Sequence, residues 1–183
     1  LLCLKINTIS VKVSVRRGIV IQVISEPDGG GAQRIVRKLG ELIGSYGFET
    51  HVVYFHNPRN ISLADNETDL KLDSPHDLRA IYRARKLIQK ITSDREAIVH
   101  VHLAWPLYFM PFSLMLSKSR LVFTEHNTHN RRRSTLGLRW VERFVYSNYE
   151  RIICISLGAH RSLSRWLSSA VIDKKLQIIV NGS

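Results

Sequence analysis

The chain has 183 residues, of which 27 are Lys or Arg, 15 are Asp or Glu and 44% are hydrophobic. This length suits one domain with a sizeable core, and the ordinary composition excludes a collagen, a coiled coil, a disordered tail and a disulfide mini-protein. The longest apolar run, residues 103–116, contains two prolines and is shorter than the roughly 20 residues that cross a bilayer. Two cysteines are too few for a secreted disulfide framework and fit a reducing cytosol.

The charge is strongly basic and unevenly distributed. The formal net charge of +12 favours polyanionic partners such as nucleic acid, anionic lipid or phosphorylated small molecules. Residues 126–172 hold eight Arg and no Lys against two Glu, and the planar guanidinium group suits phosphate and carboxylate. A basic face that only contacts solvent is the alternative interpretation of the same residues.

Hydrophobic patterning from residue 18 onward predicts strands that alternate with helices. The expected strands are residues 19–24, 51–55, 97–102, 120–125, 151–155 and 176–180. The expected helices are residues 35–46, 77–91, 105–116, 136–149 and 157–167, and residues 57–74 are expected to be irregular. This alternation predicts an α/β, Rossmann-like three-layer domain with a mainly parallel sheet.

The two ends of the chain differ from this pattern. Residues 1–17 alternate loosely, show no secretory signal and are interpreted as an N-terminal arm outside the domain at residues 18–183. The last expected strand leads directly into Asn181-Gly182-Ser183, which is a turn signal. We therefore expect the sequence to stop at a boundary before a second domain.

A glycine-rich loop follows the first expected strand and contains Gly29, Gly30, Gly31 and Gln33. In an open parallel sheet, ligands bind beyond the carboxyl ends of the strands. Consecutive glycines let backbone N–H groups approach a ligand, and the next helix offers its positive N-terminus to a phosphate or carboxylate. The loop matches neither the GxGxxG dinucleotide fingerprint nor a Walker A loop, so a tight turn without a ligand is the alternative.

Two histidines end the third expected strand. His100 and His102 share one face of the strand because side chains alternate, and His102 lies at its carboxyl end. An imidazole there could orient or deprotonate a hydroxyl, since it titrates near neutral pH. A metal pair is the rival hypothesis, but no third ligand has suitable spacing, so no metal is expected. A buried, hydrogen-bonded histidine is the plain structural alternative.

The densest polar cluster, residues 124–133, follows the fourth expected strand. It holds one Glu, two His, two Asn and three Arg, which favours recognition of a polyhydroxyl or phosphate group by residues such as His126, Asn127 and Arg131. An ordinary surface loop is the alternative. Ser156 follows the fifth expected strand and either caps the next helix or binds a ligand.

The basic segment also carries apolar side chains, among them Leu138, Trp140, Val141 and Phe144. Basic residues beside exposed aromatic rings can bind an anionic lipid surface. The same stripe would equally serve as core packing for a helix whose opposite face is solvated. The sequence leaves both interpretations open.

Taken in order, these motifs resemble the N-terminal half of a retaining glycosyltransferase of the GT-B fold, family 4. Residues 29–34 resemble the family's Gly-Gly-Ala-Glu loop, and residues 100–102 resemble its His-x-His strand end. Residues 124–127 resemble its Thr-x-His-Asn turn, and residues 155–156 and 179–182 resemble the stretches that end its first domain. Gln33 departs from the pattern, because the family often has Glu there.

The resemblance implies two Rossmann-like domains facing each other across a cleft, of which this sequence holds the acceptor-binding one and lacks the donor-binding C-terminal one. It places the glycine loop near the donor diphosphate and makes His102 the catalytic residue. His126, Asn127 and Arg131 would then shape the acceptor side, with Ser156 also in contact with substrate. The expected partners are a nucleotide sugar, which is a substrate rather than a cofactor, and a saccharide or lipid-linked acceptor.

By the same resemblance the protein is expected in the cytoplasm or on the inner face of a membrane, in polysaccharide or cell-envelope glycan synthesis, and this chain alone is expected to be inactive. One alternative is a non-catalytic subunit that supplies acceptor or membrane binding to a separate donor-binding chain. A second is an epimerase-like enzyme of a related two-domain fold. A nucleic-acid-binding module is a third, but no recognition helix or RNA-binding aromatic motif supports it, so no nucleic acid partner is expected.

Overall fold

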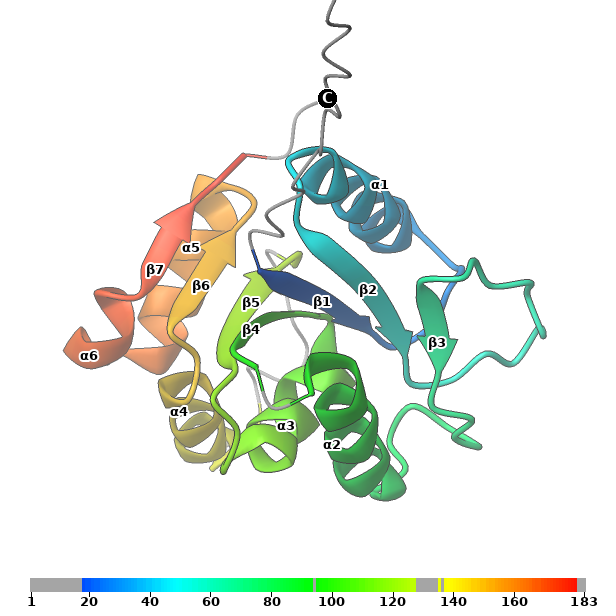
Figure 1. Ribbon diagram of the computed structural model, residues 1–183. Helices are drawn as coiled ribbons and strands as arrows, with labels where there is room; N and C mark the ends of the chain where they lie inside the picture. The colour runs from blue at the N-terminus through cyan, green and yellow to red at the C-terminus, as the bar shows by residue number, and fades with distance from the viewer. Residues whose placement is uncertain (1–17, 94, 128–134, 136, 181–183) are drawn as a thin grey trace, which may run out of the picture.

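The computed structural model describes residues 18–93, 95–127, 135 and 137–180. Within these ranges, seven strands form one sheet in the order β3-β2-β1-β4-β5-β6-β7 (Figure 1), and every neighbouring pair is parallel. The strands are β1 (Ile19–Ile24), β2 (Glu49–Tyr54), β3 (Glu67–Asp69), β4 (Ala97–His102), β5 (Arg120–Glu125), β6 (Arg151–Cys154) and β7 (Leu176–Ile178).

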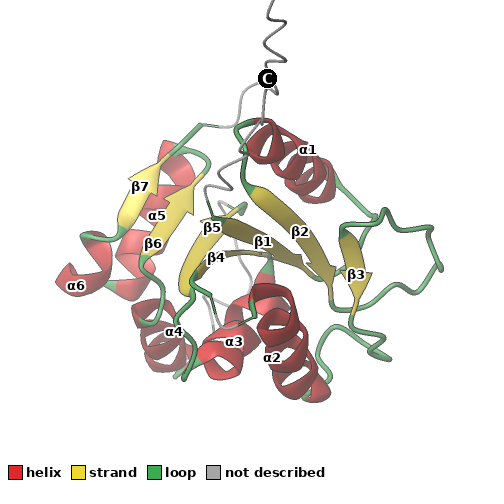
Figure 2. Ribbon diagram, viewed as in Figure 1, coloured by secondary structure: helices red, strands yellow, loops and turns green. Residues whose placement is uncertain are grey.

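Helices cover both faces of the sheet. They are α1 (Gly31–Ser45), α2 (Arg79–Thr92), α3 (Ala104–Leu114), α4 (Leu138–Ser147), α5 (Leu157–Leu167) and α6 (Ala170–Asp173). Figure 2 shows α1 on one side of the strands and α2, α3 and α4 on the other. Leu163 of α5 and Ile172 of α6 belong to the same core as those three helices. The predicted α/β, Rossmann-like three-layer domain is therefore confirmed, and the sheet is parallel throughout the described residues.

The alternation of side chains along β1 separates two apolar clusters. Ile21 and Val23 lie in the large core beneath α2 to α6, whereas Ile24 belongs to a smaller cluster with Val36 of α1. All six residues of β1 are buried, which is the pattern of a strand covered on both faces. Gln22 is the one polar residue among them and is fully buried.

The structure differs from the sequence-based expectation in short or polar elements. Residues 57–74 were expected to be irregular, but β3 lies within them, and the four-residue α6 was not expected. The final strand ends at Ile178 rather than at residue 180, and α1 begins at Gly31 rather than at residue 35. Hydrophobic periodicity cannot detect β3, because its residues Glu-Thr-Asp are all polar.

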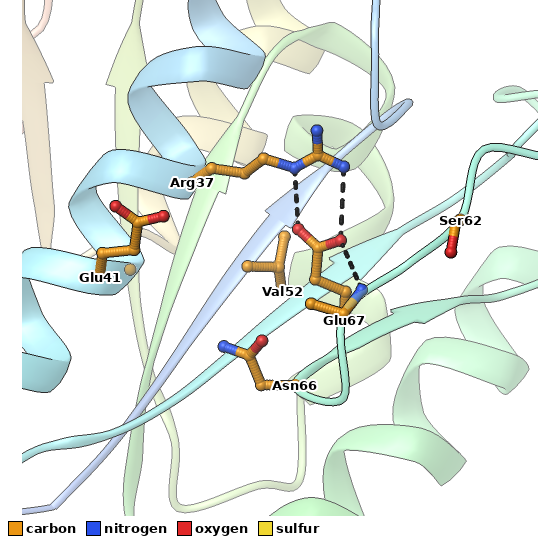
Figure 3. Close-up of a pocket in the computed structure, with 8 residues that line it drawn as sticks. Arg37, Glu41, Val52, Ser62, Asn66 and Glu67 are labelled. Atoms are coloured by element: carbon orange, nitrogen blue, oxygen red, sulfur yellow. Dashed lines mark hydrogen bonds and ion pairs between the residues drawn. The ribbon is translucent and has the colours of Figure 1, made fainter.

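Polar contacts hold β3 at the edge of the sheet. Glu67 accepts hydrogen bonds from Arg37 Nε at 2.9 Å, Arg37 Nη2 at 3.3 Å, the Tyr54 hydroxyl at 2.7 Å and the Ala64 backbone N–H at 3.1 Å. Burial raises the pKa of Glu67, but these bonds outweigh burial and leave that pKa below its ordinary value. Figure 3 shows the Arg37 guanidinium facing the Glu67 carboxylate beside a cavity of about 310 Å³.

We expect Glu67→Ala to lower the free energy of unfolding by about 2 kcal/mol, because it removes the acceptor of two partly buried donors, Arg37 Nη2 and the Tyr54 hydroxyl. Urea denaturation at pH 7 measures the loss. Asp65→Ala, two residues earlier and exposed, is the matched control. Equal losses of stability in the two variants would contradict the role of the Glu67 hydrogen bonds in holding β3.

The order of the strands creates a switch point between β1 and β4. The chain runs from β1 through β2 to β3 at one edge, and then returns to place β4 on the other side of β1. The connections after β1 and β4 therefore diverge, and ligands in such sheets bind in the crevice beyond the carboxyl ends at that point. The sequence places the glycine loop after one of these strands and His102 at the end of the other.

Candidate functional site

The glycine loop leaves β1 with an exposed backbone. Gly29 has φ +123°, a conformation that favours glycine, and Gly30 occupies the position before the first turn of α1 without a side-chain cap. A Cβ added at Gly31 would meet no atom within 4 Å. The backbone N–H groups of the first turn are thus open to an anion.

The side chain of Gln33 contacts this loop. Its Nε2 donates to the backbone carbonyl of Asp28 at 3.3 Å, and the Asp28 carboxylate is paired with Arg59 at 2.8 Å. A small cavity of about 50 Å³ adjoins the loop and is lined by Asp28, Gly29 and Arg59 among others. Gln33 therefore braces the loop, while its amide oxygen remains near Gly30.

His102 is buried at the end of β4, and both of its ring nitrogens are engaged. Its Nε2 lies 2.7 Å from Gln22 Oε1 on the neighbouring strand β1, and its Nδ1 lies 3.1 Å from His126 Nε2 just after β5. The side chain is 1% exposed. Gln22 of β1, His102 of β4 and His126 after β5 thus lie in one row across three adjacent strands.

Burial controls the charge of these histidines. It lowers the pKa of His102 well below its ordinary value, and the neighbouring His100 and His126 lower it further. Burial also lowers the pKa of His126, which retains partial contact with solvent. The row is consequently neutral at pH 7, and His126 is its outermost imidazole.

His100 lies beside the row but makes a separate contact. Its Nε2 lies 2.7 Å from the Thr124 hydroxyl, and its ring centroid is 4.2 Å from that of His102. Burial, followed by the nearby His126, lowers its pKa to about 4. His100 therefore packs and hydrogen-bonds as a structural residue, which was the plain alternative in the sequence analysis.

The turns at this edge are held in special conformations. Leu103, the residue after His102, has φ 65° and ψ 174°, a region that is otherwise almost restricted to glycine. Glu125 is buried at the end of β5, where it accepts from the Asn127 backbone N–H at 3.0 Å and from the Tyr146 hydroxyl at 3.2 Å. These contacts fix the turn that carries His126 and leave the Asn127 side chain exposed.

Ser156 caps α5. Its hydroxyl accepts from the Ala159 backbone N–H at 3.1 Å, so the capping interpretation is confirmed, and contact with a substrate stays a prediction. We expect Ser156→Ala to lower the free energy of unfolding by about 1 kcal/mol, and Ser156→Asp to retain the cap. Thermal denaturation of both variants checks this, and equal losses in the two would contradict it.

The sheet brings most of the predicted site residues to one edge. β1, β4, β5 and β6 are consecutive neighbours, and their carboxyl ends are followed by the glycine loop, His102, His126 with Asn127, and Ser156 in turn. Arg131 lies outside the described residues. Gln22 and Thr124 were not predicted as partners of the histidines. The available signal was the single polar residue in the apolar run at 19–24.

The described part of the chain shows neither a metal site nor a membrane-spanning helix. No group of three or more His, Cys, Asp or Glu side chains there is arranged to hold a metal ion. Across the same residues, no helix has both the length and the apolar character needed to cross a membrane.

The fold and the arrangement of this edge define a Rossmann-like α/β domain whose candidate site lies at the carboxyl edge of a parallel sheet. A family model described as Glycosyltransferase Family 4 matches residues 29–182. The chain belongs to that family. No curated protein matches the chain.

Solved structures share the fold at low sequence identity. A sucrose-phosphate synthase from Thermosynechococcus elongatus is 12% identical with a TM-score of 0.66, over 91% of this chain and 49% of that one. A glycosyltransferase from Rickettsia africae is 14% identical with a TM-score of 0.67, over 90% and 43%. Anabaena HepE, in complex with UDP and glucose, is 12% identical with a TM-score of 0.64, over 90% and 44%. The chain thus spans less than half the length of these structures.

Proposed function

We propose that the chain is the acceptor-side domain of a retaining glycosyltransferase that moves a sugar from a nucleotide-sugar donor to a saccharide or lipid-linked acceptor. The observation that carries this proposal is the row of loops at the switch-point edge, where an open glycine loop lies beside a neutral imidazole row. Family membership and the fold support the reaction class, and the complex of HepE with UDP and glucose supports the kind of donor.

The two parts of the edge suit the two substrates. The uncapped N-terminus of α1 offers N–H groups and a positive dipole to the donor diphosphate. A neutral imidazole suits a sugar hydroxyl, which it can orient by accepting its hydrogen bond. Because both nitrogens of His102 are engaged within the protein, we propose that His126 presents the free nitrogen to the substrate and that His102 positions it. No cofactor beyond the donor is proposed.

The experiment uses the protein at the length at which it occurs in its source cell. Release of nucleoside diphosphate from nucleotide sugars is measured with and without saccharide and lipid-linked acceptors. We expect release to depend on an acceptor, and His126→Ala to slow it at least about 100-fold. His51→Gln changes a histidine of β2 that lies away from this edge, and is the matched control. Release that needs no acceptor and is equal in both variants would overturn the proposal.

An apolar patch suggests where a lipid-linked acceptor is met. Trp140 and Phe144 of α4 are 70% and 58% exposed, and the ring of Phe112 of α3 lies beside that of Phe144, tilted by 37° with 6.2 Å between ring centroids. The Arg143 guanidinium lies 4.7 Å from the centre of the Trp140 ring. Exposed aromatic rings beside basic groups bind anionic lipid headgroups. We therefore propose a peripheral position on the inner face of a membrane, with this patch against the lipid.

Vesicle flotation tests the patch directly. The protein is mixed with vesicles of phosphatidylcholine alone or with added phosphatidylglycerol, and the double variant Trp140→Ser, Phe144→Ser is compared with Tyr82→Ser. Tyr82 lies on α2 and is 67% exposed, so it is the matched control. We expect binding only to the anionic vesicles and its loss only in the double variant. Equal binding by the unaltered protein and both variants would contradict a role of this patch in lipid binding.

A further inference from the structure

Gln22 is placed where a polar side chain is costly. It lies in the middle of the sheet on β1, has no exposed surface, and stands in register with His100 of β4. Its Oε1 is 2.7 Å from His102 Nε2, but its Nε2 has no hydrogen-bond partner among the residues that the structure describes. Buried N–H groups without a partner destabilise the fold, so packing alone does not account for an amide at this position. A buried polar side chain that is not fully hydrogen-bonded is typical of functional positions.

The contacts of Gln22 form one continuous chain of hydrogen bonds. Gln22 Oε1 contacts His102 Nε2, and His102 Nδ1 contacts His126 Nε2 at 3.1 Å. At the outer end of these hydrogen bonds, His126 Nδ1 takes part in neither of them and belongs to a side chain that is partly exposed at the carboxyl edge of the sheet. A neutral imidazole has one N–H and one acceptor nitrogen, so each link fixes the next.

Two directions of donation satisfy the same distances. With Oε1 of Gln22 facing His102, His102 donates from Nε2, accepts at Nδ1 from His126 Nε2–H, and leaves His126 Nδ1 as an acceptor. With the amide reversed, every link reverses, and His126 Nδ1 carries a proton and is a donor. The orientation of one buried amide therefore decides what the outermost nitrogen can do to a substrate.

We propose that Gln22 is a positioning residue that fixes the direction of this chain, so that His126 Nδ1 is kept as an acceptor for a substrate hydroxyl. The direction of the hydrogen bonds depends only on Gln22, His102 and His126. That the acceptor nitrogen meets a substrate hydroxyl rests on the proposed function. An acceptor nitrogen at that point can take the proton of an attacking hydroxyl, and a donor nitrogen cannot. In that orientation the amide nitrogen of Gln22 has no hydrogen-bond partner among the described residues.

The test reads the imidazole tautomers by NMR. The ¹⁵N-labelled chain, without donor or acceptor, is studied near pH 7.5 with long-range ¹H–¹⁵N correlation spectra. We expect His102 and His126 each to be a single neutral tautomer protonated at Nε2. A proton on Nδ1 of His102 in the unaltered protein would overturn the proposal, whether or not any variant folds.

Two substitutions at Gln22 separate positioning from packing. Gln22→Met removes the amide, keeps the volume and leaves His102 Nε2 without its partner, so we expect mixed tautomers at His102 and His126 in a variant that still folds. Gln22→Glu supplies an ionised carboxylate that can only accept, so it is expected to restore the single Nε2–H tautomers and to raise the pKa of His102. Unchanged tautomers in Gln22→Met would overturn the proposal.

Thr124→Val is the matched control, because it removes the hydrogen bond of His100 and leaves the chain from Gln22 to His126 intact. We expect its His102 and His126 tautomers to match those of the unaltered protein. The outcome is independent of the proposed reaction, since no substrate is present. If the tautomers are as expected but the protein transfers no sugar, only the proposed function is overturned. If the protein transfers sugar but the tautomers are reversed, only the role of Gln22 is overturned.

Discussion

Replacing Glu142 by alanine is expected to lower the free energy of unfolding by about 4 kcal/mol. Glu142 of α4 is 1% exposed. It accepts from the Tyr108 hydroxyl of α3 at one carboxylate oxygen and from Trp166 Nε1 of α5 at 2.7 Å at the other. The carboxylate thereby joins three helices that pack on the same face of the sheet. Its removal deletes the acceptor of both hydrogen bonds and leaves a void where the carboxylate was.

Urea denaturation at pH 7 measures this effect. Glu150→Ala is the matched control, because its carboxylate is about half exposed and lies 3.7 Å from Arg120 in a surface ion pair. We expect that control to change stability by less than about 1 kcal/mol. Glu142→Gln should fall between the two, since its amide keeps one acceptor but turns a donor toward a donor. A Glu142→Ala loss no larger than that of Glu150→Ala would contradict the role assigned to this residue.

The sheet could be predicted because burial on both faces leaves a plain record in the sequence. The run at residues 19–24 is apolar except for Gln22, the run at 97–102 is apolar except for its two histidines, and the structure places them in the interior of the sheet as β1 and β4. Parallel strands need crossover helices, so the alternation of elements also gave the three layers. Strand β3 could not be predicted, because it is held by hydrogen bonds from Arg37 and Tyr54 to its Glu67, and these residues are distant in sequence.

The site could be predicted only to the level of loops. Sequence spacing put His102 and His126 at the ends of strands, and the structure confirms that these strands are neighbours. It could not show that the two imidazoles contact each other, that Gln22 occupies the other nitrogen of His102, or that His102 is buried. Those facts depend on the register between strands, which is set by three-dimensional packing. The resemblance made His102 the reacting group, which stays a prediction; among the described residues, both ring nitrogens of His102 have partners, and the one contact of His126 is made by its Nε2.

Acidification is expected to destabilise the protein between about pH 6.5 and pH 4, with His100 alone contributing about 3 kcal/mol. Burial holds the pKa of His100 at about 4 in the folded protein, while an unfolded histidine titrates near its ordinary value of about 6.5. Between these values the unfolded chain binds a proton that the folded chain does not. Lowering the pH therefore favours unfolding, and the stability contributed by neutral His100 is fully present only above the upper value.

The pKa values of His102 and His126 are lowered as well, so they add to the same loss. Urea denaturation at a series of pH values measures the total, and His100→Leu isolates one share of it by removing the titrating ring while keeping the site apolar. Thr124→Val is the matched control, because it loses the same hydrogen bond but keeps the imidazole. Its stability should fall with pH as steeply as that of the unaltered protein. A His100→Leu variant with that same steep fall would show that burial of His100 is not what makes the protein sensitive to acid.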